Sequence, residues 1–478
     1  MSFHRQLTVS IAMFCVEAFA QAADPAAPDA SYFLEGELAG SLKSDRPLPL
    51  YDADPQSLAN RLFSAFYMRT SEIPSKREGK PIRRIEGGDV IDFLAWPGSA
   101  YWSDPETCRR LSSLADDCLA DFSRVRPADP VRRALLQRDL WAAFDFYAGQ
   151  NIARQGDKAA RDRRETICRK LALVLRGLTL SPAEIQSLPD TYAAAVKSGK
   201  FAAKHGFDPS LDYLPPRLLT DPDEWQEIDF FQPHQNPTDF QSRNVTVHTR
   251  NYLARSYFRI FYKLPGGRAA LEKYLKVIDR EGINWEKSAQ TGSAKFLPTA
   301  PPIPVGTEVA LMQLLITLDD QLRPVPTRIV ESVQMRIFRN VDGKPEPPTN
   351  TGVGMNVSEY TLKRRLLFDG LKQGGLERTP DKKPIYRVIF QAPNAPDWGS
   401  GGRSLSLVQD CRRCHTGADQ IGGETIFSLV HSGGFDAGAT LGVSHPLAAG
   451  MPSPRGPRAV MWKTRHETYR RLLEYLGE

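Results

Sequence analysis

Two cysteines and a histidine near the C-terminus have the spacing of a covalent haem site. Cys411 and Cys414 are separated by two arginines, and His415 follows directly. Two thiols at this spacing can add to the two vinyl groups on one edge of haem, while the adjacent imidazole binds the iron. The motif occurs once in the chain, so it predicts a single haem.

The same thiol pair could instead form a redox-active or structural disulfide, or half of a zinc site. A zinc site needs two more ligands, and the sequence has no second paired cluster; His431 and His445 are isolated. A thiol redox motif usually opens a helix in a thioredoxin-like unit, whereas this motif follows a stretch rich in Gly and Ser, 399–406. Haem is therefore the preferred interpretation, and the disulfide and zinc site remain alternatives.

This C-terminal region resembles the c-type cytochromes. The resemblance covers residues 411–415 together with the loop and helix that follow them. It implies one covalent haem c, bound through Cys411 and Cys414, with His415 as the proximal iron ligand. The family usually has a helix directly before this motif, whereas the preceding residues here, 397–402, are rich in glycine.

The sixth iron ligand decides between electron transfer and chemistry on small molecules. Monohaem cytochromes of this family commonly use a downstream methionine in a loop with proline, and Met451 stands in the similar stretch 450–454. Thioether ligation would raise the reduction potential and shield the iron. The rival ligands are His431, His445, His466 and Met461, and a site without a protein ligand is a further alternative.

The N-terminus has the pattern of an export signal. His4 and Arg5 precede an apolar stretch, 7–16, and small residues follow in an A-x-A arrangement. We expect cleavage after Ala22, with Ala20 or Ala23 as alternatives, and a periplasmic mature protein without a transmembrane segment. Haem attachment in c-type cytochromes takes place beyond the cytoplasmic membrane, so the two signals agree.

Composition narrows the class of protein. The chain has 478 residues, 41% of them hydrophobic and 25% charged, which disfavours wholesale disorder and a protein with many membrane spans. Lys+Arg 62 against Asp+Glu 56 gives a net charge of +6, too small over this length to indicate nucleic acid. Basic residues gather near the haem motif, where they could steer an acidic redox partner protein or form a solvated surface.

Helix start signals and apolar patterns divide the chain. Asp54–Pro55, Asp129–Pro130 and the capping box of Ser181 with Glu184 each predict the start of a helix. The continuously apolar run 309–318 and the alternating run 333–337 predict strands, as does the run 385–390. We therefore expect an α+β multidomain protein with these parts: 1–22 signal peptide, 23–50 flexible leader, 51–215 helical domain, 216–302 aromatic-rich helical or irregular segment, 303–395 β-rich segment, and 396–478 haem-binding region with a single terminal helix, 463–475.

The remaining cysteines have a structural interpretation. Cys108 and Cys118 lie on one face of an expected helix, too far apart along it to form a disulfide with each other. Either could meet Cys168, but three cysteines leave at least one free thiol. Burial as small hydrophobic residues is the preferred interpretation.

The functional expectation follows from the haem motif. The leading hypothesis is an exported monohaem protein that passes single electrons, with the other regions as scaffold or docking domains. A haem enzyme or gas-binding sensor with an open iron site is the first alternative, and a structural or interaction protein anchored by haem is the second. No hydrolase triad, phosphate loop or distinctive pair of carboxylates stands out, so no catalytic side chain is predicted.

Overall fold

The computed structural model describes residues 49–67, 69–73, 82–86, 105–149, 156–202, 211–229, 256–281, 286–287, 294–295, 304–339, 355–379, 445–448, 451–453 and 455–478. The expected signal peptide, the run 385–390 and the haem motif lie outside these residues. Helices and an antiparallel sheet make up the described part, which confirms the α+β class.

Six of the described helices come from the part of the chain for which the sequence predicts helices. They are α3 (Leu58–Tyr67), α5 (Pro105–Ala120), α6 (Pro130–Ala148), α8 (Lys158–Gly177), α9 (Pro182–Ser187) and α10 (Thr191–Lys197). The Asp129 side chain caps α6 by accepting from the Val131 N–H, with Pro130 at the first helical position. Ser181 and Glu184 form the capping box of α9. These two predicted helix starts are therefore confirmed. The start predicted at Asp54–Pro55 is wrong, because residues 54–57 form bends and turns and α3 begins at Leu58.

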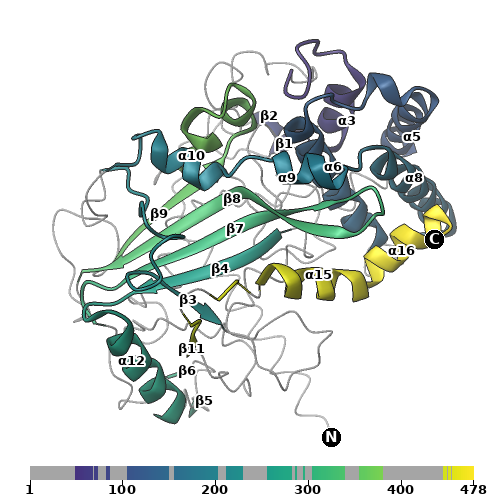
Figure 1. Cartoon of the computed structure of the whole chain (residues 1–478). Coiled ribbons are helices and arrows are strands. Elements are labelled where there is room, and N and C mark those ends of the chain that lie inside the picture. Colours follow the sequence, from purple (N-terminus) through teal and green to yellow (C-terminus); the bar gives the residue numbers. More distant parts are fainter. Residues whose placement is uncertain are drawn as a thin grey trace, which may run out of the picture.

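One antiparallel sheet of seven strands has the order β10-β9-β8-β7-β4-β3-β11. Its strands are β3 (Gln226–Asp229), β4 (Ser256–Lys263), β7 (Glu308–Leu318), β8 (Pro324–Phe338), β9 (Met355–Leu362), β10 (Leu376–Arg378) and the two-residue β11 (His445–Pro446). The strands expected at 309–318 and 333–337 are confirmed as parts of β7 and β8. Figure 1 shows the sheet as the centre of the described molecule.

Two strands of this sheet come from a segment for which the sequence predicts helical or irregular structure. β3 and β4 lie within 216–302, while the helix expected there is confirmed as α12 (Gly267–Glu281). Six of the eight residues of β4 are buried, on both faces of the sheet. A strand covered on both faces loses the alternation of polar and apolar residues by which a sequence shows a strand.

The sheet carries a β-bulge at Glu331. Gln313 of β7 lies opposite Ser332, and the next residue, Leu314, lies opposite Val330, so Glu331 is the extra residue. An unpaired residue of this kind bends the strand and changes the direction of the side chain. The bulge turns the Glu331 carboxylate toward α6, where it binds Arg138.

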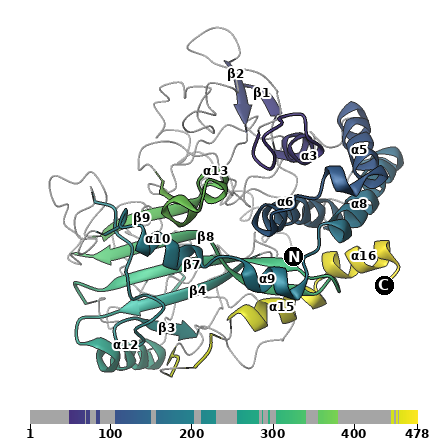
Figure 2. The ribbon, with the colours of Figure 1, turned by 45° about the horizontal axis from the view of Figure 1, so that its top comes forward.

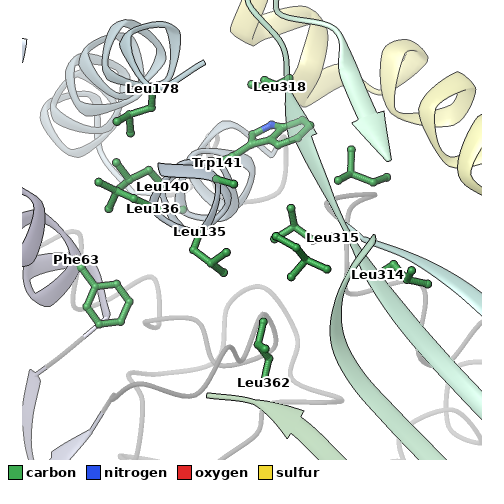
Figure 3. Close-up of a cluster of buried hydrophobic side chains, with 14 of the residues drawn as sticks. Phe63, Leu135, Leu136, Leu140, Trp141, Leu178, Leu314, Leu315, Leu318 and Leu362 are labelled. Atoms are coloured by element: carbon green, nitrogen blue, oxygen red, sulfur yellow. The ribbon is translucent and has the colours of Figure 1, made fainter. Parts of the chain in front are cut away.

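The helices and the sheet share one apolar core. Figure 3 shows Trp141 of α6 beside Leu318 of β7, and Leu135 of the same helix on the side of Leu315. The large apolar side chains Leu135, Leu136, Leu140, Trp141 and Phe144 of α6 are fully buried, and the core cluster runs from Leu50 to Leu476. Burial of each such side chain contributes about 1.5–3 kcal/mol.

Polar contacts also fix α6 on the sheet. The Gln137 side-chain amide donates to the Leu178 and Leu318 carbonyls, each at 3.1 Å. Its oxygen accepts from the Thr317 hydroxyl at 2.5 Å and from the Leu318 N–H at 2.7 Å. Because Gln137 is fully buried, these four bonds leave its amide satisfied where no water reaches it.

The chain ends in two helices, not the single helix expected over 463–475. They are α15 (Arg455–Arg465) and α16 (Glu467–Leu476), separated at His466. Figures 1 and 2 show α15 along the sheet beside β4 and α16 beside α8. The His466 ring explains the break, because it accepts a hydrogen bond from the Thr468 N–H and so caps α16.

Short elements complete the described structure. They are two hairpins, β1 (Arg69–Ile73) with β2 (Ile82–Glu86) and β5 (Glu286–Lys287) with β6 (Ala294–Lys295), the helix α13 (Arg364–Phe368), and the 3₁₀ turns η1 (Phe122–Arg124) and η2 (Lys372–Gly375). Among the described helices, none has the length and apolar character required to cross a bilayer.

Candidate functional site

The segment with the haem motif connects the two edges of the sheet. It leaves β10 after Arg378 and re-enters at His445 in β11, and β10 and β11 are the first and last strands of the sheet. Six strand spacings separate these edges, which is about 29 Å. Cys411, Cys414 and His415 themselves lie outside the described residues, and so does the rival ligand His431.

Met451 lies just after β11, in a stretch that is tied to the sheet edge. β11 pairs with β3 through His445 opposite Asp229 and Pro446 opposite Ile228. The Leu447 N–H then donates to the Glu227 carbonyl at 2.8 Å. The sequence alone did not suggest this strand, because two residues are too few to show a pattern.

Side chains of α12 and β3 hold the residues around Met451. Arg268 Nη2 donates to the Leu447 carbonyl at 2.6 Å, and the Met451 N–H donates to the Ala448 carbonyl at 3.1 Å. The Ser453 hydroxyl donates to the Glu227 carboxylate at 2.5 Å. Met451 is thus fixed from both sides by contacts of the main chain and of buried Glu227.

The Glu227 carboxylate is fixed in turn by an ion pair. Arg259 Nη2 lies 2.8 Å from Glu227 Oε2, and Arg259 Nε donates to Oε1 at 3.3 Å. A bidentate pair between a guanidinium and a carboxylate has a defined geometry. This pair therefore sets the position of the oxygen that Ser453 binds.

The thioether of Met451 is open to approach. The residue is 63% exposed, whereas most methionines pack in apolar surroundings. An exposed methionine whose backbone is held in place is suited to bind the iron of a group that lies outside the sheet. Two thiols for covalent attachment, at 411 and 414, and an imidazole and a thioether as iron ligands, at 415 and 451, are the residue types that a six-coordinate haem c would require, so the residue types present fit that group.

The other described candidates for the sixth ligand are placed differently. Met461 is half-buried within α15, and His445 is part of the ladder of β11 with β3. His466 is occupied as the N-cap of α16, with Nδ1 2.9 Å from the Thr468 hydroxyl. The His466 ring is half-buried and engaged in this cap.

His466 gives the chain a predicted pH dependence. Burial, and after it the nearby Lys463 ammonium, lowers the pKa of His466 below its ordinary value of 6.5. As the pH falls, His466 therefore takes up its proton in the unfolded chain before it does so in the folded chain. The free energy of unfolding consequently decreases as the pH drops from about 7 through the pKa values of His466 in the two states. Protonation also removes the lone pair that caps α16, a bond worth about 1 kcal/mol. We expect urea unfolding to show wild type losing stability between pH 7 and 5.

A variant separates this residue from the other titrating groups. His466→Asn supplies a good N-cap that does not titrate. Its free energy of unfolding should fall less steeply with pH than that of the wild type. An equal slope for both proteins would contradict the assignment of the pH dependence to His466.

A buried ion pair joins the last two helices to α6. Lys463 Nζ lies 2.5 Å from Asp145 Oδ2 and 3.3 Å from the Thr468 hydroxyl. The same ammonium lies 4.8 Å from the centre of the Trp141 ring, in a cation–π contact. Lys463 and Asp145 are both fully buried, so this pair fixes where α15 meets α6.

A second buried charge cluster lies where α6, α13 and the sheet meet. Asp139 binds Arg364 through Nε and Nη2, at 2.7–3.1 Å, and also accepts from the Tyr51 hydroxyl and from Arg138. Arg138 Nε in turn donates to Glu331 at 2.7 Å. Burial raises the pKa of Tyr51, and the Asp139 carboxylate raises it further, so the phenol stays protonated.

Sequence reasoning missed this charge cluster. Arg138 and Asp139 are adjacent in the sequence and lie between apolar residues of α6. This position is the one sequence signal for the cluster, because charged residues within an apolar stretch of a core helix must be buried and paired. The cluster consists of paired buried charges.

The three described cysteines are free and buried, which confirms their structural interpretation. Burial raises the pKa of both the Cys118 and the Cys168 thiol to about 12. Thiols of this kind stay protonated near neutral pH and are poor nucleophiles. Within the described ranges, no cluster of three or more His, Cys, Asp or Glu side chains could hold a metal ion.

Comparison with protein-family models, with curated proteins and with solved structures found no match to this chain. The described fold belongs to the α+β class. The functional proposal therefore depends on the sequence motif and on the Met451 turn, the turn closed by the bond from the Met451 N–H to the Ala448 carbonyl.

Proposed function

We propose that this chain is an exported c-type haem protein that transfers single electrons. In this proposal Cys411 and Cys414 bind haem through thioether bonds, and His415 is the proximal iron ligand. The observation that carries it is the spacing of these three residues, in which each has its own chemical role.

Met451 is the proposed sixth ligand. Its support is the combination of an exposed thioether and a backbone anchored to Glu227 and to α12. Met451 follows His415 by 36 residues (451 − 415), and the stretch between them is long enough to pass around a haem. Methionine as the axial partner of histidine raises the reduction potential of iron.

Bound haem supplies a one-electron carrier whose ligands change little between its two oxidation states. The protein residues have the task of keeping that coordination constant. His415 is next to a covalent attachment point, and Met451 is on a restrained turn. Restraint on both ligands excludes water and small molecules from the iron, which favours electron transfer over catalysis.

The body of the protein is proposed to act as a scaffold. The sheet fixes both ends of the segment 380–444, at β10 and at β11. The helices and sheet would thereby hold the haem segment in place and offer a surface to a redox partner protein in the periplasm. A protein that binds gas or substrate at an open iron site is the alternative that the following experiment can distinguish.

The proposal predicts the behaviour of Met451→Ala. The wild-type reduced protein should bind carbon monoxide poorly, because the thioether fills the sixth position. The variant should bind it readily and show a lower reduction potential, since the ligand that raises the potential is gone. Absorption spectra with and without carbon monoxide and a redox titration would measure both.

Met461→Ala is the matched control. Met461 is half-buried in α15, so its removal should change stability slightly and leave the haem spectrum as in wild type. Ready binding of carbon monoxide by the wild type would contradict Met451 ligation and would favour an enzyme or sensor with an open site.

A further inference from the structure

Ser453 links the Met451 turn to the sheet through its side chain. Its hydroxyl donates to Glu227 Oε1 at 2.5 Å, and Glu227, in β3, is 8% exposed. The same oxygen accepts from Arg259 Nε at the longer distance of 3.3 Å. The bond from Ser453 is thus the shorter of these two, on a carboxylate oxygen that is costly to leave without a good donor.

The Ser453 hydroxyl also contacts the start of α15. The Arg455 N–H, in the first residue of that helix, donates to Ser453 Oγ at 3.4 Å. The helix begins close against the sheet, because a Cβ added at Gly456 would lie 3.0 Å from Cγ of Pro326 in β8. Such close packing leaves this end of α15 little freedom to shift. Ser453 is therefore held between a strand and a helix that is itself packed on the sheet.

The link from Ser453 to Met451 is short and stiff. Met451 lies two residues before Ser453, and Pro452 separates them. The proline ring fixes its own φ at about −65° and disfavours helical conformations of the residue before it, here Met451. On the other side of Met451, the Leu447 N–H donates to the Glu227 carbonyl and holds the chain to the same strand. A displacement of Ser453 is therefore transmitted to Met451.

We propose that Ser453 is a positioning residue for Met451, and that its hydrogen bond to Glu227 holds the thioether at the haem iron. This inference rests on the proposed function, in which Met451 is the sixth ligand. A small molecule reaches the iron only when the thioether has left it, so the rate of its binding follows the fraction of molecules in which Met451 is displaced. The Ser453 hydroxyl keeps this fraction small and thereby limits access to the iron.

Ser453→Ala tests this role with a small change of shape. Loss of a hydrogen bond to a charged group changes an equilibrium by about tenfold. In stopped flow, the reduced variant should therefore bind carbon monoxide about tenfold faster than the reduced wild type. Ser453→Thr keeps a hydroxyl and should restore the wild-type rate. Thr464→Ala is the matched control, because it removes an exposed hydroxyl of α15 that bonds within its own helix, and it should leave the rate unchanged.

Hydrogen exchange gives a second readout that does not depend on the iron. In the full chain, the amides of residues 447–453 should exchange about tenfold faster in Ser453→Ala than in the wild type, since the bond that restrains the turn is gone. The amides of β7 should exchange as in the wild type. Unchanged exchange at 447–453 would overturn the proposal, because the hydroxyl would then not restrain the turn.

Met451→Ala separates a failure of this proposal from a failure of the proposed function. A chain without covalent haem, or a Met451→Ala variant that binds carbon monoxide as the wild type does, would contradict the proposed function. If Met451→Ala opens the iron but Ser453→Ala binds carbon monoxide at the wild-type rate, the positioning role of Ser453 alone is refuted. A Ser453→Ala variant that is less stable but has wild-type carbon monoxide binding would assign Ser453 to the start of α15 and would likewise overturn the proposal.

Discussion

Asp139→Ala should lower the free energy of unfolding by about 3–5 kcal/mol, the range for breaking a buried ion pair by removing one partner. The carboxylate of Asp139 is fully buried and binds two guanidinium groups and one phenol. Its loss leaves Arg364 charged and without its anion in the core. Urea unfolding at pH 7 would measure the change.

The charge balance at Arg364 is the physical reason for this large effect. Burial alone would lower the pKa of Arg364, but Asp139 and Tyr51 more than compensate, so that pKa lies above its ordinary value. The guanidinium also lies 4.7 Å from the centre of the Phe63 ring. Removing the carboxylate therefore exposes the desolvation cost that the ion pair had offset.

Two controls show whether charge or packing is responsible. Asp369→Ala removes a carboxylate of an exposed pair with Lys372 and should change stability by less than about 1 kcal/mol. The double variant Asp139→Leu with Arg364→Met replaces the pair by apolar groups and should be more stable than Asp139→Ala. A double variant that is less stable than the single one would refute this explanation.

Replacing both Cys411 and Cys414 with serine should abolish covalent haem retention. Each thiol is proposed to form one thioether bond, and serine cannot form either. After denaturation, the wild-type chain should keep its haem and the variant should lose all of it. Haem staining of a denaturing gel gives this result directly.

Cys118→Ala provides the matched control for the loss of a cysteine. Cys118 is buried in the helical core, and its thiol stays protonated. The variant should therefore retain haem as the wild type does, with a modest loss of stability from the small cavity. Equal loss of haem in this variant would mean that haem retention reports folding and not attachment at the motif.

Much of the fold can be predicted from local signals. The Asp129 cap and the capping box of Ser181 mark helix starts because the side chain and its backbone partner are within three residues of each other. β7 is readable because it is long and mostly apolar. Signals of this kind need no knowledge of what the element packs against.

The parts that could not be predicted depend on distant partners. Asp139 and Arg364 are 225 positions apart, and Arg138 and Glu331 are 193 apart, so their pairing appears only in the folded chain. The Met451 turn likewise depends on Glu227 of another strand. The break between α15 and α16 is a local event, but the histidine at that position is a less common cap than serine or aspartate.

The central proposal is haem bound covalently through Cys411 and Cys414, and the mass of the exported chain tests it most directly. The full chain should be produced with haem loading, purified, denatured in acid and measured by intact mass spectrometry. We expect the mass of the chain from residue 23 onward plus one haem, retained after denaturation. A mature chain with the unmodified mass, after export in cells that load haem onto another c-type cytochrome, would contradict the proposal.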